Sequence, residues 1–279
     1  MTAVIDPDWM AQEPDGRPLT ISDLQVAFGG NKVIEDVDLA FSNGFNGLIG
    51  PNGAGKTTLF NVISGYVQPT RGSVSLHGRD LTQLSKTDRS KVGIGRTFQS
   101  PKLILDATVM ENVLLGRHHL FRWGHLAELF FWPPQLREET EARHICMAML
   151  ERFELDGQVH EKAGNLSLGA QKLVEMCRAL VSQPQVVLLD EPAAGLGADD
   201  VSVLLRGLRE LASEQQLCLV IIEHDLELVT NLCTEISVLH FGKIISKGPP
   251  EVVTNDSVVV EAYLGDSYRQ ADAEATGEM

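Results

Sequence analysis

Short apolar segments separated by turn residues dominate the first hundred positions of the chain. Apolar residues alternate with polar ones, or form short continuous runs, in five segments that predict strands: Thr20–Phe28, Lys32–Phe41, Phe45–Ile49, Ser73–Leu76 and Gly93–Phe98. The turn Gly29-Gly30-Asn31 joins the first two into a hairpin. We therefore predict an antiparallel β subdomain near the N-terminus. A glycine-rich loop follows Gly50, and then a helix with an apolar face formed by Leu59, Val62 and Ile63.

The hydrophobic period changes near Pro101. Apolar residues then recur at spacings of three and four, which predicts two amphipathic helices, carrying Ala142, Ile145, Met149 and Phe153 and, further on, Leu173, Met176, Cys177, Leu180 and Val181. Little strand pattern remains before Gln183, so we predict an inserted helical subdomain over about residues 101–183. Its irregular segment His118–Pro134 is either local core beneath a loop or a partner contact, because it gathers Trp123, Phe130, Phe131 and Trp132.

Strand patterns return after Gln183. Val186–Leu189 and Leu217–Ile222 are continuous apolar runs, as expected for strands of a parallel sheet that is covered on both faces. The segment between them carries one apolar helical face, formed by Val201, Leu204, Leu205, Leu208 and Leu211. Strands that alternate with helices indicate an α/β fold with a mainly parallel sheet.

The length and composition fit one large domain, or one domain with an inserted subdomain. The chain has 279 residues, of which 43% are hydrophobic, so it can bury a sizeable core. We assign the folded domain to residues 19–265. Residues 1–18 carry the acidic residues Asp6, Asp8, Glu13 and Asp15, and residues 266–279 are polar and acidic, so we predict flexible tails over both segments.

The charge balance argues against a nucleic-acid partner. The formal net charge is −15 and the pI is about 4.9, whereas a nucleic-acid-binding protein needs a basic face to offset phosphate charge. No apolar run approaches the roughly 20 residues that span a bilayer, and the N-terminus lacks the features of a signal peptide. The four cysteines show no CxxC spacing, as in a reducing compartment. We expect a soluble, cytoplasmic chain that reaches a membrane through a partner.

A phosphate-binding motif lies between the third predicted strand and the following helix. Gly50–Thr58 fits the pattern GxxxxGK[ST], and a strand before it and a helix after it are the context that the motif requires. Glycines let backbone N–H groups turn toward the β-phosphate, and the helix N-terminus adds a positive dipole. Lys56 places a cation at the β- and γ-phosphates, and the Thr57 hydroxyl can ligate Mg²⁺. The predicted nucleotide-binding residues here are Asn52, Gly53, Ala54, Gly55, Lys56, Thr57 and Thr58.

Two carboxylates end the apolar run Val186–Leu189. Ligands bind at the carboxyl ends of strands in such sheets. Asp190 is positioned to hold Mg²⁺ through water, and Glu191 to orient or deprotonate an attacking water molecule. A strand that ends in Asp-Glu is weak evidence by itself, and the phosphate loop makes the functional interpretation the favoured one.

Four motifs in this order resemble the nucleotide-binding subunit of an ABC transporter. They are the phosphate loop, Leu166-Ser167-Leu168-Gly169-Ala170-Gln171, Leu189-Asp190-Glu191-Pro192, and His224 after an apolar strand. The resemblance covers roughly Leu19 to Gly265. It implies a P-loop NTPase fold, ATP hydrolysis coupled to transport, and ATP and Mg²⁺ as the bound groups.

The resemblance also implies roles for individual residues. Phe28 lies at the aromatic position that stacks on adenine. Gln99, in Gly95-Arg96-Thr97-Phe98-Gln99, matches the glutamine that contacts Mg²⁺ and the attacking water, in a loop that faces the membrane partner. His224 matches the histidine that contacts the γ-phosphate. The implied catalytic residues are thus Glu191, His224 and Gln99, and the implied magnesium ligands are Thr57, Gln99 and Asp190.

The signature segment departs from the usual family pattern. Ser167 and Gly169 are kept and are implied to bind nucleotide, but Leu168 replaces glycine and Ala170 replaces glutamine. Gly197 stands where aspartate is common. In this family, ATP lies between the phosphate loop of one subunit and the signature of another, so a second ATPase subunit, identical or different, is implied. The departures are compatible with a heteromeric pair that has two unequal sites.

Softer signals resemble the importers of branched-chain amino acids and their relatives that carry urea, amides or hydrophobic amino acids. They are Gly95–Gln99, Glu111-Asn112-Val113, Asp190–Leu196 and Glu261-Ala262-Tyr263-Leu264-Gly265, and Gly116–Leu155 resembles the larger ATPase subunit of that group. The group implies two ATPase subunits, two transmembrane permease subunits and an extracytoplasmic solute-binding protein. The chain would then lie at the cytoplasmic face of the cell membrane.

Two other functions stay open. One is an ABC exporter ATPase, for example of lipid type. The other is a soluble ABC ATPase acting on DNA, ribosomes or cofactor assembly, although the chain has a single cassette and no long heptad insertion. A small-molecule P-loop kinase would leave the signature segment and His224 unexplained.

Overall fold

The computed structural model describes residues 17–118 and 133–263. The two predicted tails lie almost wholly outside these ranges, as does the aromatic cluster of Trp123, Phe130, Phe131 and Trp132. Within the described chain, contacts define two units, of which one comprises residues 1–89 with 218–279 and the other residues 90–217. Each unit is described by itself.

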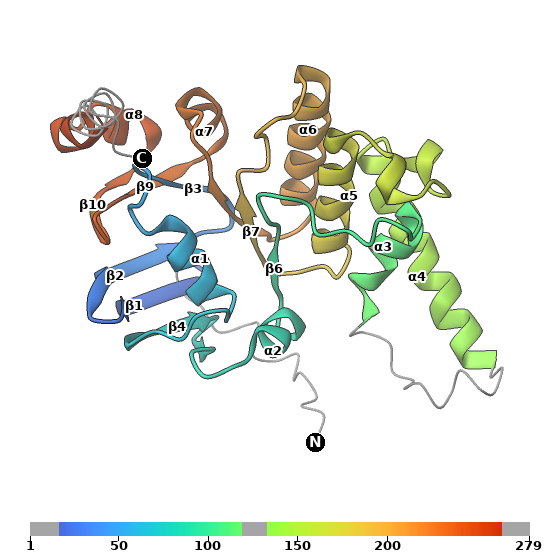
Figure 1. The fold of residues 1–279 in the computed structure, drawn as a ribbon, viewed down its shortest axis with the longest axis horizontal. Coiled ribbons are helices and arrows are strands. Elements are labelled where there is room, and N and C mark those ends of the chain that lie inside the picture. Colours follow the sequence, from blue (N-terminus) through green and yellow to red (C-terminus); the bar gives the residue numbers. More distant parts are fainter. Residues whose placement is uncertain (1–16, 119–132, 264–279) are drawn as a thin grey trace. The chain divides into compact units, whose positions relative to one another are not determined.

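The first unit contains two sheets. Their strands are β1 (Leu19–Phe28), β2 (Asn31–Phe41), β3 (Gly44–Ile49), β4 (Arg71–Leu76), β5 (Arg79–Asp80), β8 (Cys218–Ile222), β9 (Glu235–His240) and β10 (Lys243–Gly248). One sheet has the antiparallel order β2-β1-β4-β5. In the other, β3 pairs in parallel with both β8 and β9, and β10 pairs antiparallel with β9. The antiparallel N-terminal sheet and the parallel strands of the predicted α/β fold are both confirmed (Figure 1).

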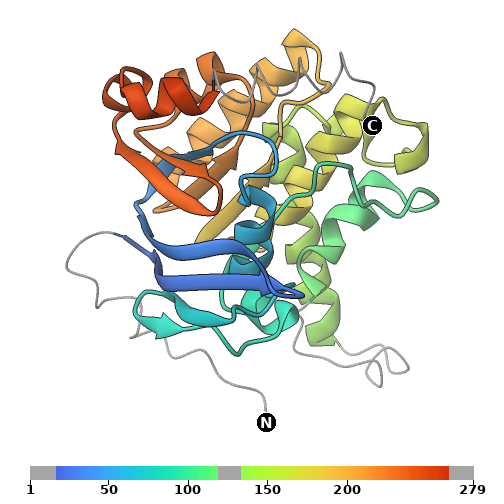
Figure 2. The same cartoon turned by 60° about the vertical axis from the view of Figure 1, so that its left-hand side comes forward.

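The first hairpin turns more tightly than predicted. Phe28 of β1 pairs with Asn31, so Asn31 is the first residue of β2 and only Gly29 and Gly30 form the turn. Both glycines have positive φ, of 55° and 88°. A two-residue hairpin turn of this kind needs residues that tolerate φ > 0 at both central positions, which explains the Gly-Gly pair. The long β1–β2 ribbon is seen in blue in Figure 2.

Helices of the first unit are α1 (Lys56–Ile63), α2 (Lys86–Lys91, which crosses the unit boundary), α7 (Leu226–Leu232) and α8 (Pro250–Thr254). α8 packs against β9 and β10, in orange and red in Figure 2. α1 is the helix predicted after the phosphate loop, and its predicted apolar face of Leu59, Val62 and Ile63 is fully buried.

Arg89 holds the end of α1 in place. It is fully buried, and its guanidinium donates hydrogen bonds to the carbonyls of Val62, Ile63, Thr82 and Leu84. The last carbonyls of a helix lack partners within the helix, and Arg89 supplies them at Val62 and Ile63. Burial lowers the pKa of Arg89, but a guanidinium stays protonated in proteins.

Replacing Arg89 with alanine is expected to lower the free energy of unfolding by about 3 kcal/mol, because buried carbonyls would lose a charged donor and a cavity would remain. Urea unfolding of the full chain measures this. Arg71→Ala is the matched control, because Arg71 pairs with Asp23 at an exposed site and such pairs contribute about 0–1 kcal/mol. Equal unfolding free energies for the two variants would refute the role of Arg89.

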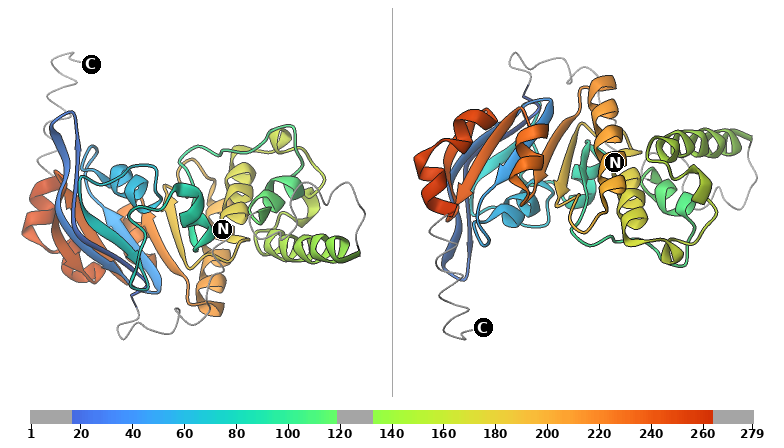
Figure 3. Two further views of the ribbon diagram at one scale, coloured as in Figure 1. Left: turned by 90° about the horizontal axis from the view of Figure 1, so that it is seen from below. Right: turned by 90° about the horizontal axis from the view of Figure 1, so that it is seen from above.

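The second unit combines a parallel strand pair with helices. β6 (Ile94–Arg96) and β7 (Val186–Asp190) run parallel. The helices are α3 (Val109–Leu115), α4 (Pro133–Arg152), α5 (Leu168–Leu180) and α6 (Ala198–Glu214), with short 3-10 helices η3 (Asp156–Gln158) and η4 (Ala163–Asn165). α3 packs against α4 and α5, as Figure 3 shows. The boundaries of the helical subdomain near residues 101 and 183 stay a prediction.

β6 is shorter than the predicted strand Gly93–Phe98. Gly93 has φ of 108°, outside strand geometry. β6 ends at Arg96, and beyond it the Asp190 amide lies 3.3 Å from the Thr97 hydroxyl and the Phe98 N–H donates to the Glu175 carboxylate. β7 is buried along its whole length, as predicted for a strand covered on both faces. In the described part of the chain, no helix has the length and apolar character needed to cross a membrane.

Candidate nucleotide site

The phosphate loop joins β3 to α1 in the first unit. Gly50, Gly53 and Gly55 have φ values of 148°, 78° and 107°, which L-residues with a side chain rarely adopt. A Cβ atom on Gly50 would lie 1.9 Å from the Leu239 carbonyl oxygen, so only glycine fits there. Gly55 is the N-cap of α1 and offers no side-chain cap. The helix therefore presents its N-terminal amides to the loop, which is the geometry of an anion site.

Lys56 lies inside the loop rather than in solvent. It is 7% exposed, and its Nζ donates to the carbonyls of Gly50 at 2.5 Å and Pro51 at 2.9 Å. A largely buried cation at the start of a helix whose first turn holds no acidic residue is suited to bind an anion of high charge. The loop and its lysine together match the requirements of a polyphosphate.

Tyr263 supports the same loop from the C-terminal end of the described chain. Its hydroxyl accepts a hydrogen bond from the Gly50 backbone, and burial raises its pKa to about 12. Tyr263 belongs to the motif Glu261–Gly265, which the sequence associated with the importer group. The start of the phosphate loop is thus contacted by Lys56 and by Tyr263.

Two more predicted residues of the first unit lie at strand ends. Phe28 is the last residue of β1 and is 51% exposed, so its ring is available for stacking. His224 is the second residue after β8, beyond Glu223, and is exposed. Asp225 caps α7 by accepting hydrogen bonds from the amides of Glu227 and Leu228. The contacts of Phe28 with adenine and of His224 with phosphate stay predictions.

The second unit brings Gln99 and Glu191 together. The Gln99 Nε2 donates to the Glu191 Oε2 at 2.8 Å, so the glutamine holds the orientation of the carboxylate. Asp190 is buried at the end of β7, with its Oδ2 3.5 Å from Nη2 of Arg96. The Thr97 hydroxyl lies 3.3 Å from the Asp190 backbone amide. Two adjacent carboxylates therefore have different surroundings, and Asp190 is the more buried of the two.

The backbone of Glu191 is held in an unusual conformation. Its φ is +49°, in the left-handed region, and such residues often lie at functional sites where the surrounding structure fixes them. Lys172 of α5 donates to the Glu191 carbonyl at 3.3 Å and also to the Ala194 carbonyl. The lysine thus ties down both ends of the turn that carries the Glu191 side chain.

Glu175, one turn further along α5, anchors the Gln99 loop (residues 96–102). It is 3% exposed, and its carboxylate accepts hydrogen bonds from the amides of Phe98 at 3.4 Å and Lys102 at 3.0 Å. Burial raises the pKa of Glu175 above its usual range, and these amides and Arg178 oppose that shift. The Lys102 ammonium nitrogen lies over the Phe98 ring, 4.1 Å from the ring centroid.

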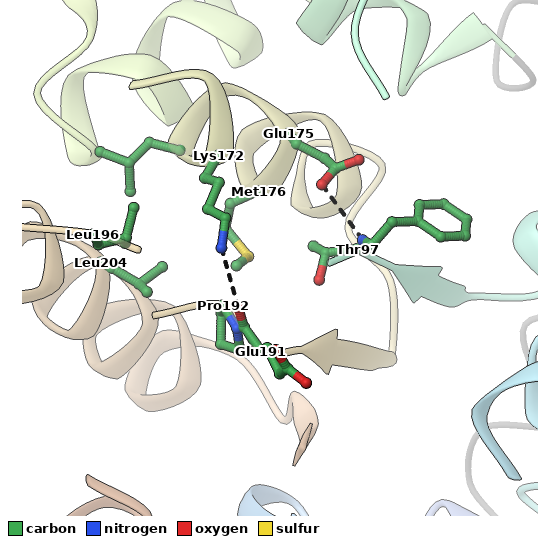
Figure 4. Close-up of a pocket in the computed structure, with 10 residues that line it drawn as sticks. Thr97, Lys172, Glu175, Met176, Glu191, Pro192, Leu196 and Leu204 are labelled. Atoms are coloured by element: carbon green, nitrogen blue, oxygen red, sulfur yellow. Dashed lines mark hydrogen bonds between the residues drawn. The ribbon is translucent and has the colours of Figure 1, made fainter. Parts of the chain in front are cut away.

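Figure 4 shows both α5 side chains directed at these loops. Lys172 reaches the backbone at Glu191, and Glu175 reaches the loop that follows Thr97. They line one pocket together with Leu173, Met176, Leu196 and Leu204. Sequence reasoning missed Lys172 and Glu175. The sequence did contain an indication of their importance, because both are charged residues within the largely apolar helix that follows the signature segment.

The signature segment (Leu166–Gln171) forms the start of α5. Ser167 is the N-cap, and its side chain accepts a hydrogen bond from the Ala170 amide at 3.1 Å. A Cβ atom on Gly169 would lie 2.1 Å from a carboxylate oxygen of Asp200, so a larger residue there would require the Asp200 side chain to move. Leu168 is 54% exposed. The departures Leu168 and Ala170 thus leave the cap intact, while the contact of Ser167 and Gly169 with a nucleotide stays a prediction.

Comparisons with known proteins agree with this geometry. The family model described as ABC transporter matches residues 34–194, more than half of the chain. The high-affinity branched-chain amino acid transport ATP-binding protein LivG of Salmonella typhimurium is 36% identical over 250 residues, which cover 89% of this chain and 98% of LivG. The protein of the same description, BraF, of Pseudomonas aeruginosa is 36% identical, covering 90% of this chain and 99% of BraF.

Solved structures give the same result. The structure of the ADP conformation of MJ1267, an ATP-binding cassette of an ABC transporter, matches with a TM-score of 0.76 and 33% identity, covering 89% of this chain and 99% of MJ1267. A nucleotide-free ATP-binding cassette from an ABC transporter also has a TM-score of 0.76, at 32% identity. The chain therefore belongs to the ABC transporter family, as an ATP-hydrolysing, nucleotide-binding subunit.

Proposed function

We propose that this chain powers a membrane importer of branched-chain amino acids or related small polar or amphipathic solutes. The proposed class of transported solute is supported by the 36% identity to LivG over nearly the full length of both proteins. The observation that supports hydrolysis is the 2.8 Å hydrogen bond between Gln99 and Glu191, because it orients a carboxylate for work on a water molecule.

In this proposal, each predicted residue has one task. Lys56 and the amides of Asn52–Thr58 bind the β- and γ-phosphates, and Phe28 stacks on adenine. Glu191 accepts the proton of the attacking water. Gln99 orients the Glu191 carboxylate and the water molecule. His224 contacts the γ-phosphate and stabilises the charge that develops there. Ser167 and Gly169 bind the nucleotide held by a second ATPase subunit, identical or different.

Mg²⁺ is the metal that the available donors suit. Thr57, Asp190 and Gln99 offer a hydroxyl, a carboxylate and an amide oxygen, and Mg²⁺ prefers oxygen ligands supplied by a few protein groups together with phosphates. Because the Gln99 Nε2 is bonded to Glu191, its oxygen is the atom left for a metal. When bound, Mg²⁺ would neutralise charge on the phosphates.

The partners follow from the same relationship. We infer two transmembrane permease subunits, a second ATPase subunit and, acting outside the membrane, a solute-binding protein. The chain would then be peripheral at the cytoplasmic face of the cell membrane. The ATPase subunit of such a system does not contact the cargo, so the cargo is tested by transport rather than by binding to this chain.

The transport test uses proteoliposomes that contain the chain with its permease subunits. We expect ATP-dependent movement of labelled leucine, isoleucine or valine when the solute-binding protein is present on the opposite side from ATP. Complexes with Glu191→Gln should show none. ATP-dependent movement of a lipid toward the side opposite ATP, with no amino acid moved, would refute the import proposal.

Phe28 has a separate testable effect. Phe28→Ala is expected to weaken ATP binding by about threefold to tenfold, because an aromatic stacking contact is worth about 0.5–1.5 kcal/mol. Phe28→Tyr should bind as the parent does, since it keeps the ring. Titration with a fluorescent ATP analogue measures this, and inorganic tripolyphosphate is the control ligand. An equal loss of tripolyphosphate affinity would contradict the stacking role.

A further inference from the structure

The helix that begins at the signature segment also holds both loops that carry Gln99 and Glu191. Ser167 starts α5, Lys172 follows in its second turn, and Glu175 lies three residues beyond Lys172. Residues three apart lie on the same side of a helix. One rigid element therefore carries a nucleotide-binding candidate at its end and two loop anchors on its side.

The contacts of the two anchors differ in kind. Lys172 donates to backbone carbonyls at Glu191 and Ala194, and Glu175 accepts from backbone amides at Phe98 and Lys102. A cation bonded to carbonyls and an anion bonded to amides each satisfy groups that a loop leaves unpaired. Neither contact depends on the side chain of a loop residue.

Arg178 completes the anchor on the Gln99 loop. Its Nη1 donates to the Lys102 carbonyl at 2.6 Å, and its Nη2 lies 3.3 Å from the Glu175 Oε1. Lys102 is thus bonded through both its amide and its carbonyl. Gln99 lies between Phe98 and Lys102, so the segment that presents its side chain is fixed at both ends by α5.

We propose that Glu175, with Arg178, is a positioning residue for ATP hydrolysis: it fixes the Gln99 loop to the signature helix so that Gln99 meets Glu191. This inference rests on the proposed roles of Gln99 and Glu191. The Gln99–Glu191 bond of 2.8 Å joins two loops that α5 anchors separately, through Glu175 on one side and Lys172 on the other. A shift of α5 at Ser167 therefore moves the reacting side chains.

The proposal predicts a defect in turnover rather than in nucleotide binding. Glu175→Gln keeps the size of the side chain but offers one acceptor oxygen instead of two, so one of the two amide bonds is lost. We expect kcat to fall by about 10- to 100-fold, because misplacing a catalytic group by about 1 Å costs about 100-fold. The KM for ATP should change by less than about threefold, because the hydrogen bonds of Glu175 go to the Gln99 loop and to Arg178, whereas phosphate binding is assigned to the loop at Lys56.

A double-mutant cycle with Gln99 tests whether Glu175 acts through that residue. ATP hydrolysis is measured for the full chain assembled with its membrane subunits, as the parent, Gln99→Ala, Glu175→Gln and the double variant. If Glu175 only positions Gln99, Glu175→Gln will lower kcat by less than about twofold when Gln99 is already alanine. The matched control is Glu139→Gln, an exposed carboxylate on α4, which should leave kcat unchanged.

The outcomes separate this inference from the function on which it rests. Equal losses from Glu175→Gln in both backgrounds, or parental kcat for Glu175→Gln, would overturn the positioning role while Gln99 keeps its own. Parental kcat for Gln99→Ala would overturn the proposed role of Gln99 and the positioning role with it. If Glu175→Gln does not fold, Arg178→Met enters the same cycle, because it removes the Lys102 carbonyl bond and leaves the Glu175 carboxylate in place.

Discussion

Glu191→Gln is expected to lower the kcat for ATP hydrolysis by about 10²- to 10⁴-fold, which is the usual contribution of a general base. Glutamine has nearly the shape of glutamate but cannot accept the proton of the attacking water. Gln99 can still donate to the new amide oxygen, so the surrounding loops should keep their structure. Nucleotide affinity should stay within about threefold of the parent, since phosphate binding is assigned to the loop at Lys56.

The measurement is phosphate release at saturating ATP, together with a nucleotide titration of the same preparation. Glu139→Gln is the matched control, because it makes the same chemical change at an exposed ion pair on α4. Parental turnover by Glu191→Gln would show that another group activates the water. A large loss of nucleotide affinity would show instead that the substitution disturbs binding.

Lys56→Ala is expected to weaken ATP binding by about 10- to 100-fold. A hydrogen bond between charged groups is worth about 1.5–3 kcal/mol, and the phosphates would lose the cation that the loop encloses. The substitution also removes the hydrogen bonds to the Gly50 and Pro51 carbonyls, so the loop would lose internal support. Titration with a fluorescent nucleotide gives the dissociation constant, and hydrolysis should fall in parallel at low ATP.

Lys32→Ala provides the comparison for this variant. Lys32 lies in the same unit and forms an exposed ion pair with Glu35, so its loss should not change nucleotide affinity. If Lys56→Ala bound ATP as tightly as Lys32→Ala, the phosphate-binding assignment of the loop would be wrong. Urea unfolding of both variants separates a loss of binding from a loss of folded protein.

Much of the fold was predictable because its signals are local. The apolar runs at Val186–Leu189 and Leu217–Ile222 became β7 and β8, and the glycine pattern Gly50–Thr58 marked the loop between β3 and α1. Such a loop needs backbone conformations with positive φ, which favour glycine, so the loop can be recognised from the positions of its glycines. The strands β9 and β10 were not predicted, because Glu235–His240 and Lys243–Gly248 mix polar and apolar residues without a clear period.

Strand and turn limits were less accurate than the presence of the strands, and contacts between residues far apart in the sequence were not predicted. The predicted strand Gly93–Phe98 ends at Arg96, and the Phe98 amide donates to the Glu175 carboxylate, which lies far along the sequence. Arg89 is a similar case. As an arginine in a short polar helix it looks like a surface residue, and only the fold shows that it is fully buried against the end of α1.

The candidate site divides in the same way. Residues in motifs, such as Lys56, Gln99 and Glu191, were identified from sequence because each motif has a fixed spacing. Lys172 and Glu175 were not, because their partners are backbone atoms of other loops, and backbone contacts leave no pattern in the partner sequence. The roles proposed for Lys172 and Glu175 rest on these hydrogen bonds to the loops.

The central claim is that this chain is the ATPase of a membrane transporter. It is tested most directly by expressing tagged Glu191→Gln chain in its native cell and capturing it, with ATP, from detergent-solubilised membranes. We predict that two multi-span membrane proteins and a second ABC ATPase, or a second copy of this chain, are recovered with it. Recovery from the soluble fraction alone, with ribosomal, DNA-associated or assembly proteins, would contradict the transport function and leave only the ATPase activity.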